Sequence, residues 1–271
     1  MKFIKLLVAG KDYIYIPDQK SFCDLTGKEI IRLCNRQKGI GADGIITFIK
    51  TSSKTVQIKG FHQNGKDMLD ISSASLCTVF DDIFKNNTIE CSRNSKKNEK
   101  ITLLQDKNDF DGLFSCDMGP SAACTYREKK TEAGNRIITL TAQKLHGIHT
   151  VHFSECADLL DINYFGKNIS ENSLFHKKAD FTIAEKTGKN TFRLIHYENS
   201  TASPFPTLAV FASAALSAVI TGRANYNEEI KLMCNTDTVY AFCKKNGSAV
   251  LQCKAEKIFE GYIQKEHRPY A

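Results

Sequence analysis

The sequence predicts an α+β fold in which two halves of the chain follow the same plan. Segments with the alternating or continuous apolar pattern of β-strands outnumber helical segments. Each half also contains a strand end, a loop and then a helix start, at residues 61–80 and 197–219. One helix in each half would therefore pack within mostly antiparallel strands, and the chain is interpreted as an internal duplication.

In the first half, periodicity and turn signals predict each element. The expected elements are strands at residues 2–7, 13–16, 45–49, 55–61, 101–104 and 113–118, a helix at residues 25–35 and a second helix from residue 72. Gly10 and the Asn64-Gly65 pair indicate turns, and Ser72 or Ser73 is a suitable helix N-cap.

The second half is expected to repeat this rhythm. Strands are expected at residues 137–141, 149–153, 180–185, 191–197, 229–233, 238–243, 249–254 and 257–263, with helices at residues 157–165 and 207–222. Gly119-Pro120 closes the first half. The predicted domains are residues 1–117 and 118–263, and residues 264–271 are expected as a strand that returns to the first domain.

Composition indicates a globular protein with a large core. The chain has 271 residues and 42% hydrophobic content. The longest apolar segment, residues 207–221, is shorter than the roughly 20 residues that span a bilayer, so it is interpreted as a buried helix. No secretory leader with a cleavage site is evident, so we expect a cytoplasmic protein with no membrane partner.

Cysteines and charge exclude two further classes of function. The ten cysteines are scattered without a C-x-x-C pair, so reduced, mostly buried thiols are expected and no metal site. The net charge of +7 is spread along the chain among acidic residues. Its densest basic cluster, residues 93–100, lacks interleaved aromatics and is interpreted as a hairpin tip. We expect no nucleic-acid partner.

The two helix starts predict a ligand site. If they face each other across a cleft, their unpaired backbone N–H groups and positive dipole ends would all point at one small anion. A small amino acid or carboxylate is the expected ligand.

Five segments carry a resemblance to a known family, in order and over nearly the whole chain. They are residues 33–44 (LCNRQKGIGADG), residues 61–77, Asp117-Met118-Gly119-Pro120, residues 198–214 and Phe259-Glu260-Gly261. These segments resemble the diaminopimelate epimerases, whose members carry a similar arginine followed by GIGADG. The resemblance implies two pseudo-symmetric domains, each a curled sheet around a central helix, with the amino-acid site between them. It also implies a homodimer.

The resemblance implies a mechanism as well. In these epimerases one cysteine thiolate removes the α-proton and a second thiol reprotonates the opposite face, without pyridoxal phosphate or metal. Two groups are needed, because a single base would return the proton to the same face. No cofactor is therefore expected.

This chain departs from the family at both catalytic positions. The alignment places the first cysteine at Ile71 and the second at Thr207. Isoleucine does not titrate, and a threonine hydroxyl is a poor base without an activating partner. A shifted register that uses Cys77 would delete six residues of a matched segment, and no cysteine lies between Cys156 and Cys234 to supply the second thiol.

The ligand contacts of the family have also changed. Lys11, His62, Gly147 and Asp180 replace asparagines, and Asn199 replaces an arginine, whereas Glu198 and His149 are retained. The glycines Gly39, Gly41 and Gly44, with Asp43, are interpreted as structural. The candidate ligand-binding residues are Lys11, His62, Asn64, Ser72, Ser73, His149, Asp180, Glu198, Asn199, Thr207 and Leu208.

Three functions remain open. The favoured one is a non-catalytic paralogue that binds a ligand or a protein partner. The alternative is a cofactor-independent isomerase of changed chemistry, in which a carboxylate and an imidazole move the proton if burial adjusts their pKa values. Its candidate groups are His62, Asp180 and Asp70, with Asp67, His146 and His149 nearby. Diaminopimelate epimerase activity itself is the least favoured, so whether the chain is an enzyme stays open here.

Overall fold

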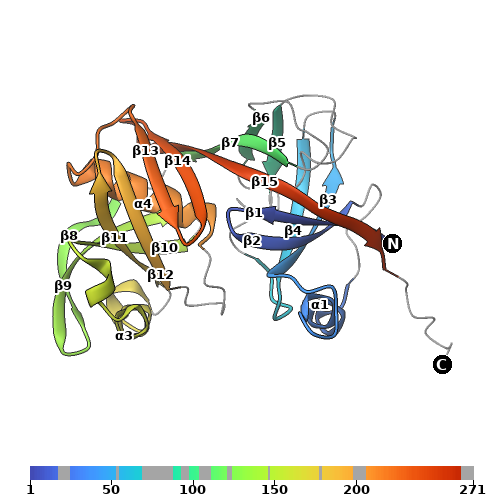
Figure 1. The fold of residues 1–271 in the computed structure, drawn as a ribbon, viewed down its shortest axis with the longest axis horizontal. Helices are drawn as coiled ribbons and strands as arrows, with labels where there is room; N and C mark the ends of the chain where they lie inside the picture. Colours follow the sequence, from blue (N-terminus) through green and yellow to red (C-terminus); the bar gives the residue numbers. More distant parts are fainter. Residues whose placement is uncertain are drawn as a thin grey trace.

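The fold consists mainly of strands with few helices, which confirms the predicted α+β class. The computed structural model describes residues 1–17, 25–52, 55–68, 88–92, 98–103, 111–120, 124–145, 147–176, 179–197 and 206–263. Fifteen strands within these ranges form one connected sheet. Figure 1 shows the sheet curling into two lobes, one built by each half of the chain.

The first half forms a closed ring of strands. Its elements are β1 (Lys2–Val8), β2 (Lys11–Pro17), α1 (Gly27–Cys34), β3 (Gly44–Lys50), β4 (Thr55–His62), β5 (Thr88–Ser92), β6 (Asn98–Leu103) and β7 (Asp111–Pro120). These strands pair in chain order, and β15 (Ser248–Tyr262) closes the ring by pairing with both β7 and β1.

The second half forms the other part of the sheet. Its elements are β8 (Cys124–Ala133), β9 (Arg136–Leu145), β10 (Gly147–Ser154), η2 (Ala157–Leu159), α3 (Ile162–Ser170), η3 (Ser173–Phe175), β11 (Ala179–Gly188), β12 (Thr191–Tyr197), α4 (Leu208–Ile220), β13 (Glu229–Cys234), β14 (Asp237–Cys243) and β15. They pair in chain order from β8 to β15.

The same order of pairings occurs in both halves. From β1 to β7 the successive pairs are antiparallel, parallel, antiparallel, parallel, antiparallel and antiparallel. The pairs from β9 to β15 follow the identical order. The shared plan predicted from the sequence is therefore present in the strand topology.

The strand β15 joins the two lobes, which the sequence did not predict. Residues 249–254 and 257–263 were expected as separate strands, but they form one continuous strand. The start of β15 pairs with β14, and Ala255–Tyr262 pairs with β1. The expected return strand at residues 264–271 lies outside the described residues. The predicted boundary after residue 117 falls inside β7, and the division into domains stays a prediction.

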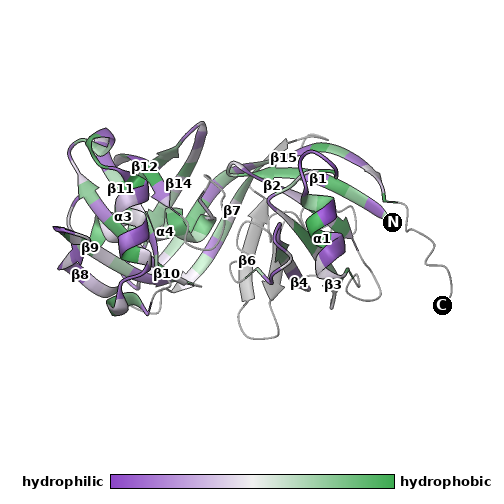
Figure 2. Ribbon diagram, turned by 90° about the horizontal axis from the view of Figure 1, so that it is seen from below, coloured by the Kyte–Doolittle hydropathy of each residue, from purple (hydrophilic) through white to green (hydrophobic). Residues whose placement is uncertain are grey.

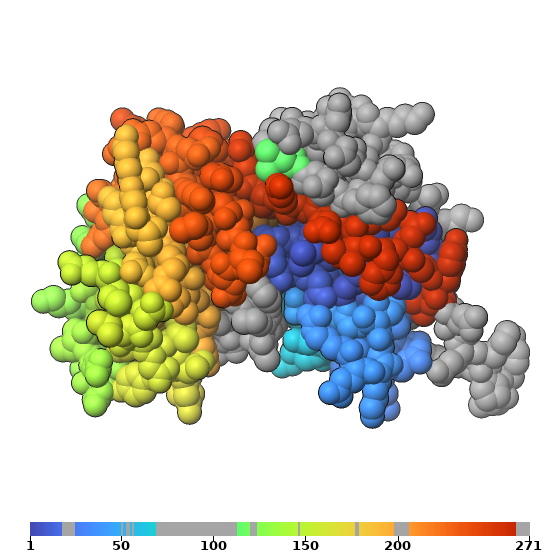
Figure 3. All heavy atoms as spheres, in the orientation of Figure 1, coloured from blue at the N-terminus to red at the C-terminus, as the bar shows by residue number. Residues whose placement is uncertain are grey.

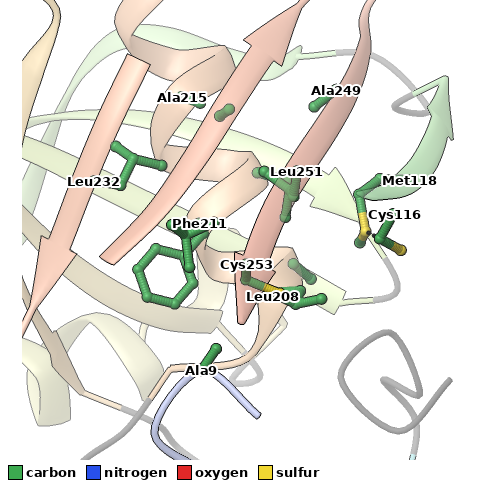
Figure 4. Packing of buried hydrophobic residues seen from close by; sticks show 14 of the residues in the cluster. Ala9, Cys116, Met118, Leu208, Phe211, Ala215, Leu232, Ala249, Leu251 and Cys253 are labelled. Carbon is green, nitrogen blue, oxygen red and sulfur yellow. Dashed lines mark hydrogen bonds between the residues drawn. The ribbon is translucent and has the colours of Figure 1, made fainter. Parts of the chain in front are cut away.

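The helix α4 is the centre of the second lobe. Each residue from Leu208 to Val219 is buried, because strands surround the helix on all sides. Figure 4 shows Phe211 and Ala215 of α4 against Leu232 and Leu251 of the sheet. Figure 2 shows α4 as largely hydrophobic, whereas α1 carries one hydrophobic and one hydrophilic face. The helix expected from residue 72 lies outside the described residues.

The structure contains two strands that the sequence pattern did not reveal, β5 and β8. In β8 most side chains from Tyr126 to Lys130 are half or fully exposed. The strand is also the last one in the order of the sheet. Charged residues are common on such edges, where they prevent association with other strands, and they hide the apolar alternation.

The glycine-rich loop after α1 is held by a charged network. A Cβ at Gly39 would lie 2.1 Å from the carbonyl oxygen of Arg32, and Gly41 has φ +78°. Arg36 donates to Asp12 at 2.8 and 2.9 Å and to Asp43 at 3.1 Å. These contacts give the loop a structural role, as its glycines suggested.

Candidate functional site

The hairpin between β1 and β2 brings the first half of the chain to α4. Ala9 (φ +48°) and Gly10 (φ +79°) form its tight turn. Ala9 belongs to the same buried cluster as Leu208 and Phe211, and Figure 4 shows it close to both. The next residue, Lys11, is only 4% exposed. A buried cation from the first half therefore lies beside the hairpin that packs against α4.

A row of polar side chains crosses the sheet of the second half. Cys124, Gln143, His149 and Asp180 are successive register partners on β8, β9, β10 and β11. Paired residues on neighbouring strands project from the same face of a sheet. Gln143 is fully buried and His149 is 4% exposed. The row therefore places the side chains of four neighbouring strands side by side on one face of the sheet.

His149 lies between a backbone carbonyl and a carboxylate. Its Nε2 atom lies 2.9 Å from the carbonyl oxygen of Leu145, and Nδ1 lies 3.4 Å from Oδ2 of Asp180. A carbonyl oxygen only accepts, so Nε2 carries a proton. The imidazole is therefore oriented with Nδ1 toward Asp180.

A second histidine, His196, lies on the same face of the sheet, on the next strand, β12. His196 is the register partner of Thr182, and its Nδ1 lies 3.0 Å from the Thr182 hydroxyl. Burial lowers the pKa of His196 to about 4; the charge of Asp180 opposes this, whereas Lys11 and His149 reinforce it. His196 is therefore neutral near pH 7, and its charge neighbours come from both halves of the chain.

The lowered pKa of His196 predicts a loss of stability in acid. Unfolding returns its pKa from about 4 to 6.5, so the unfolded state binds a proton that the folded state refuses. Stability falls as the pH drops from 6.5 to 4, by about 3 kcal/mol at most. Urea unfolding from pH 7 to 4 should show this fall in the wild type and a smaller one in His196→Asn.

The matched control is His176→Asn, which removes an exposed imidazole at the end of η3. Asparagine suits the left-handed backbone of that position, where φ is +52°. Equal acid sensitivity in His196→Asn and the wild type would show that His196 does not contribute.

Thr207 and Leu208 begin α4. Thr207 is the N-cap, with its backbone carbonyl accepting from Val210 N at 3.1 Å, but its side chain makes no capping hydrogen bond. Leu208 is completely buried. The hydroxyl of Thr207, the residue predicted at the second thiol position, is therefore not fixed by a capping hydrogen bond.

The other predicted site residues are dispersed or undescribed. His62 ends β4 and pairs with Gly44, whereas Asn64 accepts from Lys66 N at 3.1 Å within the following turn. The structure brings His149 and Asp180 together, the charge of Lys11 acts on the nearby His196, and Thr207 and Leu208 lie at the start of α4. The candidates Asp70, Ile71, Ser72, Ser73, His146, Glu198 and Asn199 lie outside the described residues.

Sequence reasoning missed Gln143 and His196. Both occur within strands whose other inward residues are apolar or small, such as Leu194 on β12. A single polar residue at an inward position of a strand was the available signal, but its partners depend on strand register, which the sequence did not reveal.

Most of the described cysteines have the properties of core residues, whereas Cys124 and Cys156 are half-buried. Burial raises the pKa of Cys34, Cys234, Cys243 and Cys253 to about 12 in each case. Burial also raises the pKa of Cys124, and the buried Cys116 donates to the sulfur of Met118 at 3.7 Å. A proton-abstracting thiolate needs a lowered pKa, so these thiols are unsuited to that role.

The described residues contain neither a metal-binding cluster nor a membrane-spanning helix. Within the described ranges, no three His, Cys, Asp or Glu side chains are grouped so that they could hold a metal ion. The helices of those ranges are too short or too polar to cross a membrane.

Comparison with known proteins identifies full-length relatives, although no family model matches the chain. The diaminopimelate epimerase of Leptospira biflexa is 20% identical over 279 residues, covering 97% of this chain and 99% of the relative. That of Acetivibrio thermocellus is 19% identical over 277 residues, covering 97% and 98%.

Solved structures share the fold over nearly the whole chain. A predicted epimerase from Pseudomonas aeruginosa has a TM-score of 0.70 at 10% identity, covering 98% of this chain and 99% of its own. A PhzF-family phenazine biosynthesis protein from Bacillus anthracis has a TM-score of 0.69 at 8% identity, covering 98% and 99%. A hydroxyproline epimerase from Agrobacterium vitis, with bound trans-4-hydroxy-L-proline, has a TM-score of 0.64 at 11% identity, covering 97% and 91%.

Proposed function

Because the chain is a divergent member of the diaminopimelate epimerase family, we propose that it binds a small carboxylate or amino acid without two-thiol epimerisation. The observation that carries this proposal is the pair of substitutions at the thiol positions, Ile71 and Thr207. Neither side chain can take a proton from a carbon and return another at neutral pH.

The described cysteines support the proposal. The thiols with a pKa raised to about 12 are almost entirely protonated at pH 7, so they cannot replace the missing thiolate. They also lie in strands and in α1 rather than at the start of α4.

Binding is supported by the polar groups near α4. Lys11, His149 and Asp180 are candidate ligand-binding residues, and their charges act on a common neighbour, His196. The hydroxyproline epimerase of the same fold holds an amino acid. A small acid therefore suits the size and charge of what this fold accommodates.

A second candidate function is an isomerase of changed chemistry. The observation that favours it is the His149–Asp180 pair, in which an imidazole and a carboxylate lie 3.4 Å apart in a largely buried position. His196 lies on the same face of the sheet, so a carboxylate and two imidazoles, the kinds of group that isomerases use for proton transfer, occur together. Asp70 and His62 are further candidates for this role.

An exchange experiment separates the two functions. The purified chain is incubated in D2O with diaminopimelate, glutamate, proline or histidine, and the α-proton signal is followed by NMR. We expect no exchange above a blank, while isothermal titration calorimetry detects binding of at least one small acid. Exchange in the wild type that disappears in Asp180→Asn would instead establish the isomerase. Exchange that persists in Asp180→Asn but disappears in Thr207→Val would show that Thr207, at the second thiol position, takes part in the reaction.

Assembly and ancestry are proposed as well. Ile258, Phe259 and Tyr262 in the second part of β15 are exposed, and beyond Glu256 no described strand pairs with the outer edge of this strand. Figure 3 shows the C-terminal part of the described chain, in red, at the surface of the molecule. An exposed apolar edge of this kind supports a homodimer, which light scattering would detect as a doubled mass.

The repeated pairing order supports an internal duplication.

A further inference from the structure

A pocket of about 420 Å³ lies between α1, the glycine-rich loop that follows it, β1 and the end of β15. Pockets of about 300 to 1,000 Å³ are the usual size of small-molecule sites in proteins. The residues that line this pocket are distinct from the candidate ligand-binding residues near α4. It is therefore a separate place on the molecule where a ligand could bind.

The walls of this pocket are largely apolar and belong to one packed cluster. Phe3 and Leu33 are buried members of the cluster around α1, and the half-buried Ile40 and Ile263 pack against it. Ile263 exchanges two backbone hydrogen bonds of 2.8 Å with Met1. Figure 1 shows the N-terminus of the chain beside the end of β15. These contacts fix the apolar walls in place.

Two glycines prevent the walls from filling the pocket. A Cβ at Gly39 would lie 2.1 Å from the carbonyl oxygen of Arg32, and a Cβ at Gly261 would lie 2.9 Å from Cε1 of Phe3. Both distances are shorter than the contacts that real Cβ atoms make. A side chain therefore cannot enter from either position unless its neighbours move.

The charged groups of the pocket are basic. Arg32 and Lys38 both line it and are exposed, and among its described lining residues none is acidic. Arg32 lies in the last turn of α1, where a cation also offsets the negative end of the helix dipole. Lys38 lies beyond the helix, where its apolar stem can cover a pocket wall while its ammonium group stays in water. The pocket thus combines apolar walls with an excess of positive charge.

We propose that this pocket binds a small amphipathic anion, with an apolar ring system or short acyl chain and a single carboxylate at one end. The apolar part would displace water from Phe3 and Leu33, and the Lys38 ammonium would attract the carboxylate. Since the pocket shares no residue with the candidate site near α4, either site can exist without the other.

Three probes with one ring system test the charge of the ligand on the full chain. Isothermal titration calorimetry in low-salt buffer compares 2-naphthoate, 2-naphthalenemethanol and 2-naphthylmethylammonium. We expect 2-naphthoate to bind at least about threefold more tightly than the alcohol, a factor typical of an exposed ion pair, and the ammonium compound to bind most weakly. Molar salt should remove most of this preference, because it screens exposed charges.

Variants locate the binding. Lys38→Met should nearly abolish the preference for 2-naphthoate over the alcohol, and Lys38→Glu should reverse it, whereas Lys38→Arg should retain it. The matched control is Lys28→Met, which removes an exposed lysine at the other end of α1, outside the pocket, and should match the wild type. Thermal unfolding checks that each variant is folded.

Four results would overturn the inference. They are absence of 2-naphthoate binding at millimolar concentration, equal or tighter binding of the alcohol or the ammonium compound, a preference that survives in Lys38→Glu, and equal effects of Lys28→Met and Lys38→Met. Displacement of 2-naphthoate by the small acid that binds near α4 would also overturn it, by assigning the probe to that site. The proposed function stands in each case, because it is tested with other ligands and at Asp180 and Thr207.

Discussion

Replacing Lys5 with methionine is expected to lower the free energy of unfolding by about 3 kcal/mol. Lys5 is 6% exposed, lies 2.7 Å from Asp12 and donates to the carbonyl oxygen of Gly41. Methionine keeps most of the side-chain volume but removes one of the positive charges of the network. Asp12 and the neighbouring Asp43 would then be paired with Arg36 alone among the contacts of this network. Urea unfolding at pH 7 measures the loss.

The pH dependence identifies the cause of that loss. Burial alone would raise the pKa of Asp12, but hydrogen bonds from Arg36 and Lys5 outweigh it and hold the pKa well below the usual range. The stabilisation is therefore complete above the unfolded pKa of about 4 and is lost as the pH falls toward the folded value. The difference between Lys5→Met and the wild type should shrink in acid.

Lys2→Met is the matched control for Lys5→Met. Lys2 lies on the same strand and pairs with Glu260 at 3.3 Å, but its side chain is 46% exposed. Exposed pairs of this kind contribute at most about 1 kcal/mol. Equal losses in the two variants would contradict the assignment of Lys5 as a buried structural charge.

Gly166→Ala is expected to destabilise the protein by about 3 kcal/mol, because it overpacks a helix–strand contact. A Cβ at this position would lie 2.2 Å from Cγ and 2.5 Å from Cβ of Tyr197. Gly166 is buried on α3, which packs against β11 and β12. Either α3 or the tyrosine at the end of β12 must move, and thermal or urea unfolding reports the cost.

Gly27→Ala provides the control for helix propensity. Gly27 is the first residue of α1, and a Cβ there has no atom within 4 Å. Alanine should be neutral or stabilising by up to about 1 kcal/mol at this site. In a double-mutant cycle, Gly166→Ala should cost much less in a Tyr197→Gly background, which removes the ring and the Cβ of Tyr197. An undiminished cost in that background would rule out the contact with Tyr197 as its cause.

Much of the fold could be predicted from local sequence signals. The Thr26 and Glu29 side chains form a capping box at the start of α1, inside the segment expected to be helical. The helix expected at residues 207–222 is α4 at Leu208–Ile220, because a continuous run of small and apolar residues suits a helix surrounded by strands. Such signals involve residues close together in the sequence, so they can be recognised without knowledge of the tertiary structure.

Long-range pairing explains where the sequence failed. Residues 249–254 and 257–263 were expected as separate strands, yet β15 continues through residues 255 and 256 because β7 and β1 supply partners. His196 was not a candidate, since its neighbours Asp180 and Lys11 are distant in sequence. Strand register determines both results, and register is a property of residues far apart in the chain.

By itself, the sequence determined the α+β plan, the glycine-rich loop around Asp43 and the absence of thiols at positions 71 and 207. Residue identity and short-range spacing are sufficient for these conclusions. Only the tertiary structure decided that the charge of Lys11 in the first half acts on His196 in the second, as do the charges of His149 and Asp180. The physical reason is that the hairpin packing against α4 and the parallel register of β10 with β11 set these positions, and both arise only when the halves fold together.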